Sequence, residues 1–138
     1  MAKGAIIKVV GKVDINKIDK DITEKYNLEE YQNQEIIQNM DLYLHTYKHI
    51  KEFKSIDSYN NALFSVEKII NDPYYIYYDS CKNSLLYFKE IDEDVCAVVK
   101  LNLRKNKDTY VSTIYPVNKN KIDRLKQKEI YNKYVINN

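Results

Sequence analysis

The sequence predicts an α+β fold in which N-terminal helices pack on a four-stranded antiparallel β-sheet and a basic helix follows the sheet. Three observations lead to this prediction. Apolar residues recur at helical spacing up to Pro73, they form strand-like runs from Tyr74 to Pro116, and the connections between those later runs are short. We expect one domain over residues 1–138, because the chain has the size of a single domain and no Gly/Ser-rich linker divides it.

The first elements expected are a strand and a helix. Residues 5–13 are β-branched and apolar enough for a strand. Asp14 is placed to cap a helix that carries isoleucines at helical spacing and ends near Tyr26. Residues 35–38 fit either a short strand or the lead-in to the next helix, and the local pattern leaves both open.

Two more helices are expected before the sheet. The first covers residues 41–53, and within it His45 and His49 lie four positions apart, so they share one helical face. The second begins near Ser58 and stops at the Asn-Asp-Pro sequence of residues 71–73, because proline ends a helix.

The predicted sheet and the closing helix come next. The four expected strands are residues 74–79, 85–91, 95–104 and 109–116. In the third, which we expect to be central, Val95 and Val99 face the core while Lys100 and Arg104 face the other side. The closing helix, residues 121–134, is expected to turn Ile122, Leu125 and Ile130 inward.

Charge is distributed unevenly along the chain. The whole chain has a net charge of +2, but from Val98 onward ten Lys or Arg face three acidic residues, a net +7, which leaves −5 for the remainder. This segregation indicates that one side of the fold meets an anionic partner. A basic helix and hairpin that are simply solvated would give the same pattern, so the alternative stays open at this point.

Cysteine usage and hydropathy disfavour a secreted or membrane protein. Cys81 and Cys96 form neither a CxxC pair nor a disulfide framework, and we expect reduced thiols. No apolar run reaches the length of a signal-peptide core or a membrane span. We therefore expect a cytoplasmic protein with no membrane partner.

Motifs for metals and cofactors are also lacking. Gly4 and Gly11 are the only glycines, so a phosphate-binding loop or a dinucleotide-binding loop is not expected. Two histidines four apart can share zinc, but Thr46 stands after His45 where the HExxH motif has glutamate. We expect neither a metal nor a cofactor.

The remaining polar residues suit the cleavage of RNA. A ribonuclease that works without a metal needs a base for the ribose 2′-hydroxyl, an acid for the leaving 5′-oxygen, and cations or hydroxyls around the phosphate. Histidine exchanges protons near neutral pH, and Lys or Arg stabilises the developing charge. A partly buried, purely structural His49 would explain the same residues, so this inventory alone does not decide the function.

Several short strings occur in the same order as in a group of phage nuclease domains. They are YKHIK at 47–51, IINDPYYI at 69–76, LYFKEI at 86–91, VVKL at 98–101, STIY at 112–115 and KIDR at 121–124. Over residues 8–134 the sequence therefore resembles the barnase/EndoU/colicin/RelE-like (BECR) nuclease domains of phages and mobile elements. The resemblance implies helices packed on a four-stranded antiparallel sheet, and RNA cleavage without a metal ion.

The resemblance also implies which residues act. The expected catalytic residues are His49 for proton transfer, Lys100 and Arg124 for the phosphate, and Thr113 for a hydroxyl contact. Many relatives have a second histidine a few positions after the first, whereas here the additional histidine, His45, comes before it. The second proton-transfer group is thus left open, and so is an inactive relative.

The leading hypothesis is a phage or mobile-element ribonuclease that acts on tRNA or mRNA. The RNA-binding residues expected are Arg104, Tyr115, Lys121, Lys126 and Lys128. If the protein is a toxin, an acidic inhibitor or antitoxin is its expected partner. The alternatives are an inactive binding module, such as an anti-defence or virion-associated protein, and a regulator that only binds nucleic acid.

Overall fold

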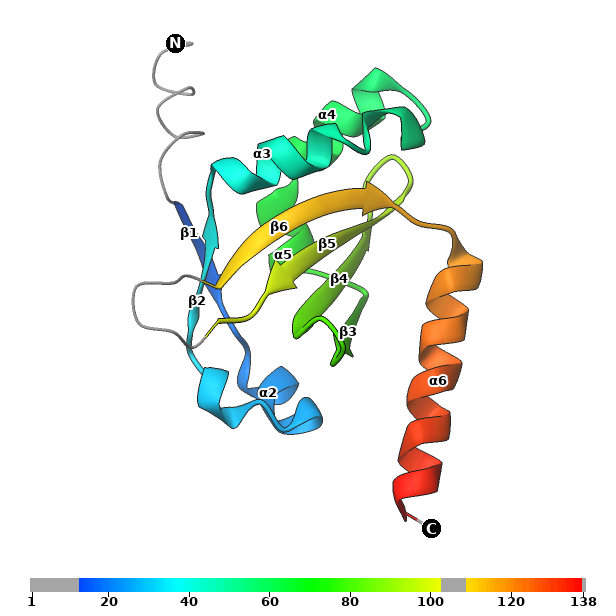
Figure 1. The fold of residues 1–138 in the computed structure, drawn as a ribbon. Helices are drawn as coiled ribbons and strands as arrows, with labels where there is room; N and C mark the ends of the chain where they lie inside the picture. The colour runs from blue at the N-terminus through cyan, green and yellow to red at the C-terminus, as the bar shows by residue number, and fades with distance from the viewer. Residues whose placement is uncertain (1–12, 103–108, 138) are drawn as a thin grey trace.

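The computed structural model describes residues 13–102 and 109–137, and within them it shows an α+β fold around one mixed sheet of six strands (Figure 1). The strands are β1 (Val13–Lys17), β2 (Glu35–Gln38), β3 (Tyr75–Asp79), β4 (Ser84–Glu90), β5 (Asp94–Lys100) and β6 (Thr109–Pro116). Their order is β1-β2-β6-β5-β4-β3. All neighbours are antiparallel except β2 and β6, which run parallel.

The expected sheet of four antiparallel strands is therefore correct for β3 to β6 and incomplete beyond β6. There, β2 pairs with β6 in parallel and β1 pairs with β2. Residues 35–38, left open by the sequence, form β2, in which Ile36 and Ile37 are both buried. Local periodicity could not show this, because a short buried strand depends on a partner far away in the sequence.

Five α-helices lie within the described residues. They are α2 (Lys20–Tyr26), α3 (Met40–Tyr47), α4 (Ile56–Phe64), α5 (Val66–Asn71) and α6 (Lys119–Asn137). Two 3₁₀ turns lie between them, at Glu29–Tyr31 and Ile50–Glu52. None of these helices combines the length and the apolar character that crossing a membrane requires.

Several helix boundaries differ from the expected ones, and the helix expected between Ser58 and Pro73 is divided at Ser65 into α4 and α5. Asp14 does not cap a helix, because it lies in β1 opposite Ile37, and Asp19 caps α2 instead. The helix expected over residues 41–53 ends at Tyr47, where i to i+3 hydrogen bonds tighten the last turn. The prediction that His45 and His49 share one helical face is therefore wrong, since His49 follows the helix.

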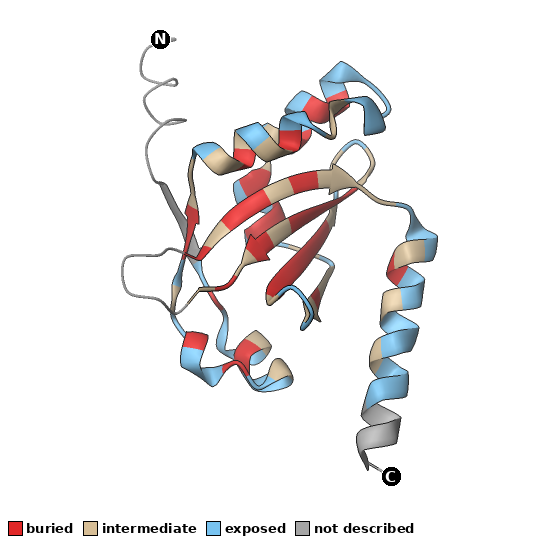
Figure 2. Cartoon of the chain, in the orientation of Figure 1, coloured by how far each residue is buried: buried red, intermediate tan, exposed pale blue. Residues whose placement is uncertain are grey.

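The sheet separates two apolar clusters. Helices α2 to α5 cover one face, the inner face, where Leu85, Val99 and Val111 of the sheet pack against Leu42 and Ile69. Many residues of β4, β5 and β6 are buried in Figure 2, and β5 lies between β4 and β6. The sequence-based prediction that this strand is central is thus confirmed within its described residues.

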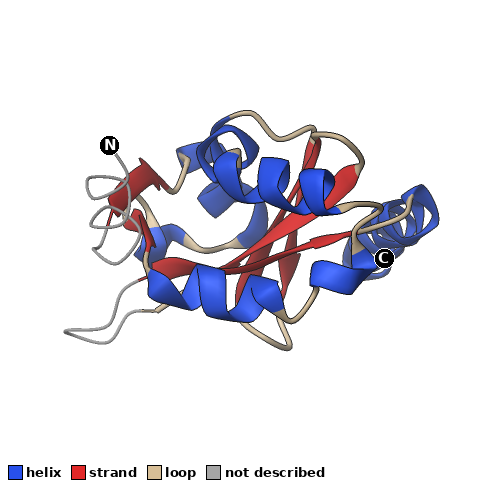
Figure 3. Cartoon of the chain, turned by 90° about the horizontal axis from the view of Figure 1, so that it is seen from above, coloured by secondary structure: helices blue, strands red, loops and turns tan. Residues whose placement is uncertain are grey.

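Helix α6 covers the opposite, outer face. It stands apart from the other helices (Figure 1), and the view from above shows helices on both sides of the strands (Figure 3). Ile122 is buried against Phe88 and Cys96, and Leu125 packs on the same cluster. Ile130 was expected to face inward but is 69% exposed, because the apolar contacts of α6 with the sheet come from its first turns, through Ile122 and Leu125.

A group of polar contacts, here called the α6 clasp, holds the middle of this helix. Lys25 Nζ of α2 lies 3.0 Å from Glu129 Oε1 of α6, and the Tyr26 hydroxyl donates to the same carboxylate. Burial and the neighbouring Glu129 raise the pKa of Tyr26 above its ordinary range, so its hydroxyl stays protonated. On the preceding turn of α6, Lys126 Nζ lies 5.2 Å from the centre of the Tyr75 ring of β3. The clasp thus ties α6 to α2 and to the edge strand of the sheet.

Candidate active site

The outer face of β3 to β6 is organised by the strand register. Residues paired across neighbouring strands project to the same side of a sheet, so their side chains form rows. The rows on this face are Asp79–Ser84–Lys100, Tyr77–Leu86–Val98–Thr113 and Tyr75–Phe88–Cys96–Tyr115. The third row is covered by α6, whereas the first two carry polar groups into a cavity beside this helix.

This cavity has a volume of about 430 Å³. It is bounded by the outer face of the sheet, by α6 and by His49, which directly precedes the second 3₁₀ turn. Six of the residues singled out in the sequence line it: His49, Lys100, Thr113, Tyr115, Lys121 and Lys128. They come from four different segments of the chain. Its size is within the range of sites that bind small molecules or nucleotide units.

His49 is held at the rim of the cavity by two neighbours. Its Nδ1 lies 2.5 Å from Glu52 Oε2, and its ring centre lies 5.5 Å from that of Tyr115. The side chain is 31% exposed, so the ring is ordered by contacts and still reachable from solvent. Because Glu52 engages Nδ1, Nε2 is the ring nitrogen left for proton exchange with a ligand.

His45 has a different position and does not line this cavity. Its Nδ1 donates to the Ser112 carbonyl over 3.2 Å. The next residue, Thr46, is fully buried, and its hydroxyl accepts from the Ile114 amide over 2.9 Å. Both contacts reach β6 where its register against β5 shifts, beside Thr113. Helix α3 thus fixes the part of β6 that delivers Thr113 to the cavity.

Sequence reasoning assigned Thr46 no structural role and noted only that it stands where the HExxH zinc motif has glutamate. The signal that would have found it is its position four residues after the buried Leu42, on the inward face of α3. A hydroxyl on such a face needs a hydrogen-bond partner, and β6 supplies one.

Replacing Thr46 with Val should lower the free energy of unfolding by about 1–3 kcal/mol, because the Ile114 amide would be left buried without an acceptor. Hydrogen exchange of the Ile114 amide measures this directly. The control is Thr46→Ser, which keeps the hydroxyl and should keep the amide protected. Unchanged protection in Thr46→Val would show that this hydrogen bond does not hold β6.

The chemistry of Tyr115 and Cys96 is limited by burial. Cys96 is fully buried, and burial raises the pKa of its thiol well above the ordinary value. Burial and the adjacent Cys96 also raise the pKa of the Tyr115 hydroxyl. Neither group therefore ionises at neutral pH to act as a base or nucleophile. The Tyr115 ring instead lies 5.0 Å from Lys121 Nζ and 5.5 Å from the His49 ring.

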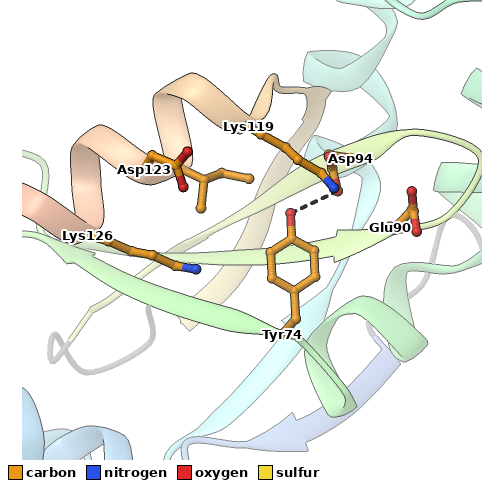
Figure 4. A pocket seen from close by; sticks show the side chains of 7 residues that line it. Tyr74, Glu90, Asp94, Lys119, Asp123 and Lys126 are labelled. Atoms are coloured by element: carbon orange, nitrogen blue, oxygen red, sulfur yellow. Dashed lines mark hydrogen bonds between the residues drawn. The ribbon is translucent and has the colours of Figure 1, made fainter.

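The cations of α6 divide between its two flanks. Lys121 and Lys128 line the cavity described above, whereas Lys126 lines a second cavity of about 280 Å³ (Figure 4). Arg124 is exposed and is not among the described residues that line either cavity. Arg104 lies outside the described residues. Two of the four predicted α6 cations are thus placed beside His49 and Lys100.

The second cavity has a mixed charge. There the Tyr74 hydroxyl donates to Asp94 Oδ1 over 2.9 Å, and Glu90, Asp123, Lys119 and Lys126 also line the cavity (Figure 4). Three carboxylates and two lysines are among its described lining residues, so it offers no net attraction to a phosphate. In the part of the chain that the structure describes, no group of three or more His, Cys, Asp or Glu residues is arranged to hold a metal ion.

Residues 8–124 match the family described as phage-Barnase-EndoU-ColicinE5/D-RelE like nuclease3. The chain belongs to this nuclease family. The matched part includes α3, the strands β3 to β6 and the start of α6, so it includes His49, Lys100 and Thr113. No curated protein and no solved structure matches the chain. The resemblance inferred from the sequence is thereby confirmed, and Lys126 and Lys128 lie beyond the matched part of this nuclease.

Proposed function

We propose that this nuclease cleaves RNA without a metal ion, by attack of a ribose 2′-hydroxyl on the adjacent phosphate. The observation that carries the proposal is that His49, Lys100 and Thr113, from three separate segments, line one cavity with the lysines of α6. This cavity combines a group for proton exchange with cations and a hydroxyl for a phosphate.

In the proposed reaction, Nε2 of His49 removes the proton of the 2′-hydroxyl. The 2′-oxygen then forms a bond to phosphorus, and the bond from phosphorus to the 5′-oxygen breaks. The 5′-oxygen takes a proton from water, which leaves a 2′,3′-cyclic phosphate and a 5′-hydroxyl. Glu52, 2.5 Å from Nδ1, stabilises the imidazolium that forms.

The phosphate would be held by Lys100 and Thr113. The Lys100 ammonium supports the charge that grows on the phosphate oxygens, and the Thr113 hydroxyl donates to one of them. Lys100 lies in β5 and Thr113 in the neighbouring β6, and hydrogen bonds from α3 hold β6 in place. A site on rigid strands keeps its geometry better than one on loops.

The experiment that tests the proposal is incubation of the protein with single-stranded RNA in EDTA, beside the same sequence with 2′-deoxyribose throughout. We expect cleavage of the RNA to persist in EDTA, to leave cyclic phosphate ends, and to be absent from the deoxy strand because it lacks the nucleophile. Cleavage of DNA that requires magnesium would overturn the mechanism.

RNA affinity should decrease steeply with salt, because binding releases counterions with a slope of roughly −0.7 for each phosphate contact on a single strand. Lys128→Glu should flatten this slope, since Lys128 lines the cavity. Lys126→Glu is the matched control, because it makes the same change on the opposite flank of α6. Binding isotherms at four salt concentrations give both slopes, and equal slopes would contradict the assignment of the cavity to RNA.

A second candidate is a module of this fold that binds RNA without cleaving it. The observation in its favour is that His45 is hydrogen-bonded to the Ser112 carbonyl. His49 is therefore the one histidine among the described residues that line the cavity. This module would bind RNA with the salt dependence above and leave every strand intact in the EDTA experiment.

The biological setting follows from the same proposal. We infer that tRNA or mRNA is the substrate in the cytoplasm, and that Arg124 and Lys121, on neighbouring turns of α6, contact the flanking backbone. A nuclease of this kind endangers the cell that makes it. An acidic protein inhibitor, which would fill the lysine-lined cavity, is the partner that this toxicity implies.

A further inference from the structure

One acidic residue stands among the lysines of the cavity. Lys82, Lys100, Lys121 and Lys128 line it, and Asp79 carries the single carboxylate of the described lining. A carboxylate repels a phosphate, so Asp79 weakens binding of the backbone unless it meets another part of the ligand. This placement needs an explanation beyond phosphate binding.

The register fixes how far Asp79 lies from the proposed phosphate site. Asp79 pairs with Ser84, and Ser84 pairs with Lys100, so two strand spacings, about 10 Å, separate the backbones at Asp79 and Lys100. One nucleotide extends over a comparable span from its phosphate to the far edge of its base. A ligand whose phosphate meets Lys100 can therefore present the edge of its base to Asp79.

The carboxylate of Asp79 is oriented by its own turn. Oδ1 accepts the Cys81 amide over 3.1 Å, in the connection between β3 and β4. Each carboxylate oxygen has two lone pairs, so this contact leaves Oδ2 and one direction of Oδ1 for a ligand. The group is thus fixed in direction and can still accept two hydrogen bonds side by side.

Guanine is the base that matches such an acceptor pair. Its Watson–Crick edge offers two adjacent donors, N1–H and the N2 amino group. The donors of adenine, cytosine and uracil on this edge each lie beside an acceptor, which a carboxylate would repel. Lys82, which also lines the cavity, adds a donor for the O6 oxygen of guanine.

We propose, on the basis of the ribonuclease function above, that Asp79 reads a guanine directly beside the cleaved phosphate. The protein is then a guanine-selective ribonuclease, and Asp79 determines its specificity without taking part in proton transfer.

Binding of nucleoside 3′-monophosphates tests the base site without any need for turnover. Guanosine 3′-monophosphate should bind the wild type at least about tenfold more tightly than the adenosine, cytidine and uridine compounds, since a good bidentate contact discriminates by about 10- to 100-fold. Asp79→Asn should remove this preference. Asparagine keeps the oxygen that accepts the Cys81 amide, so the turn and the melting temperature should persist. Asp123→Asn, an exposed change on α6, is the control and should keep the preference.

Cleavage is then measured on DNA strands that contain one ribonucleotide, with the base varied separately on each side of the cleavable phosphate. We expect cleavage beside guanine to decrease about tenfold in Asp79→Asn and cleavage beside other bases to change less than about twofold. Equal binding of all four nucleotides by the wild type would overturn the inference. An equal loss at every base in Asp79→Asn would also overturn it, because that is the behaviour of a proton-transfer or structural group. Guanine-selective binding without any cleavage would support the base site while refuting the proposed function.

Discussion

Replacing His49 with Ala is expected to reduce RNA cleavage by about 10²- to 10⁴-fold, the usual contribution of a positioned acid or base. The ring lies at the rim of the cavity, with Glu52 on Nδ1 and Tyr115 against its face. Its loss removes proton exchange at the 2′-oxygen and leaves the lysines in place. RNA binding should therefore change little, and single-turnover rates at saturating protein measure the chemical step alone.

His45→Ala is the matched control for this prediction. Its ring holds the Ser112 carbonyl and does not line the cavity, so its loss should cost about 1 kcal/mol of stability and spare most of the activity. Lys100→Ala should lower the cleavage rate with intact folding, because it removes a charge near the phosphate. An active His49→Ala beside an inactive His45→Ala would mean that the roles of the two histidines are reversed.

Replacing Val99 with Asp is expected to prevent folding. Val99 is fully buried on the inner face of the central strand, where it pairs with Leu85 of β4 and Val111 of β6, both of them fully buried. A carboxylate there has no partner and loses its hydration, which places the substitution among the most destabilising classes. Circular dichroism and thermal melting should show no cooperative transition.

The neighbouring Val98 offers the control. It lies on the outer face, is only partly buried and lines the cavity, so Val98→Asp should fold and melt cooperatively while weakening RNA binding through its charge. A Val99→Asp variant that melts like the wild type would refute the position of this strand in the core.

The antiparallel part of the fold was predictable because its information is local. Short connections made β3 to β6 neighbours, Pro73 ended the helices before them, and alternation along β5 placed Lys100 and Val99 on opposite faces. The extension by β2 was not predictable, because its partner β6 lies far along the chain and pairs with it in parallel. The helix after β1 was displaced for a similar reason, since Asp14 and Asp19 are both good caps and only the pairing of β1 decides between them.

The site was predictable in its strands and less so in its helices. Because side chains alternate between the two faces along a strand, Lys100, Thr113 and Tyr115 lie on the outer face. Helical spacing separates Lys121 and Lys128 from Lys126, but it cannot tell which flank of α6 meets the cavity. For the histidines, the early end of α3 decided the outcome, and that end depends on contacts with β6 that no local pattern reveals.

The α6 clasp has a consequence for the protein during its synthesis on the ribosome. Chains emerge from the ribosome N-terminus first, so the whole sheet is available to fold before α6 appears. Until Glu129 reaches Lys25 and Tyr26, the cavity lacks the two lysines that α6 brings to it. If the protein cleaves RNA as proposed, a nascent chain in which α6 has not yet reached the sheet is therefore a poor nuclease.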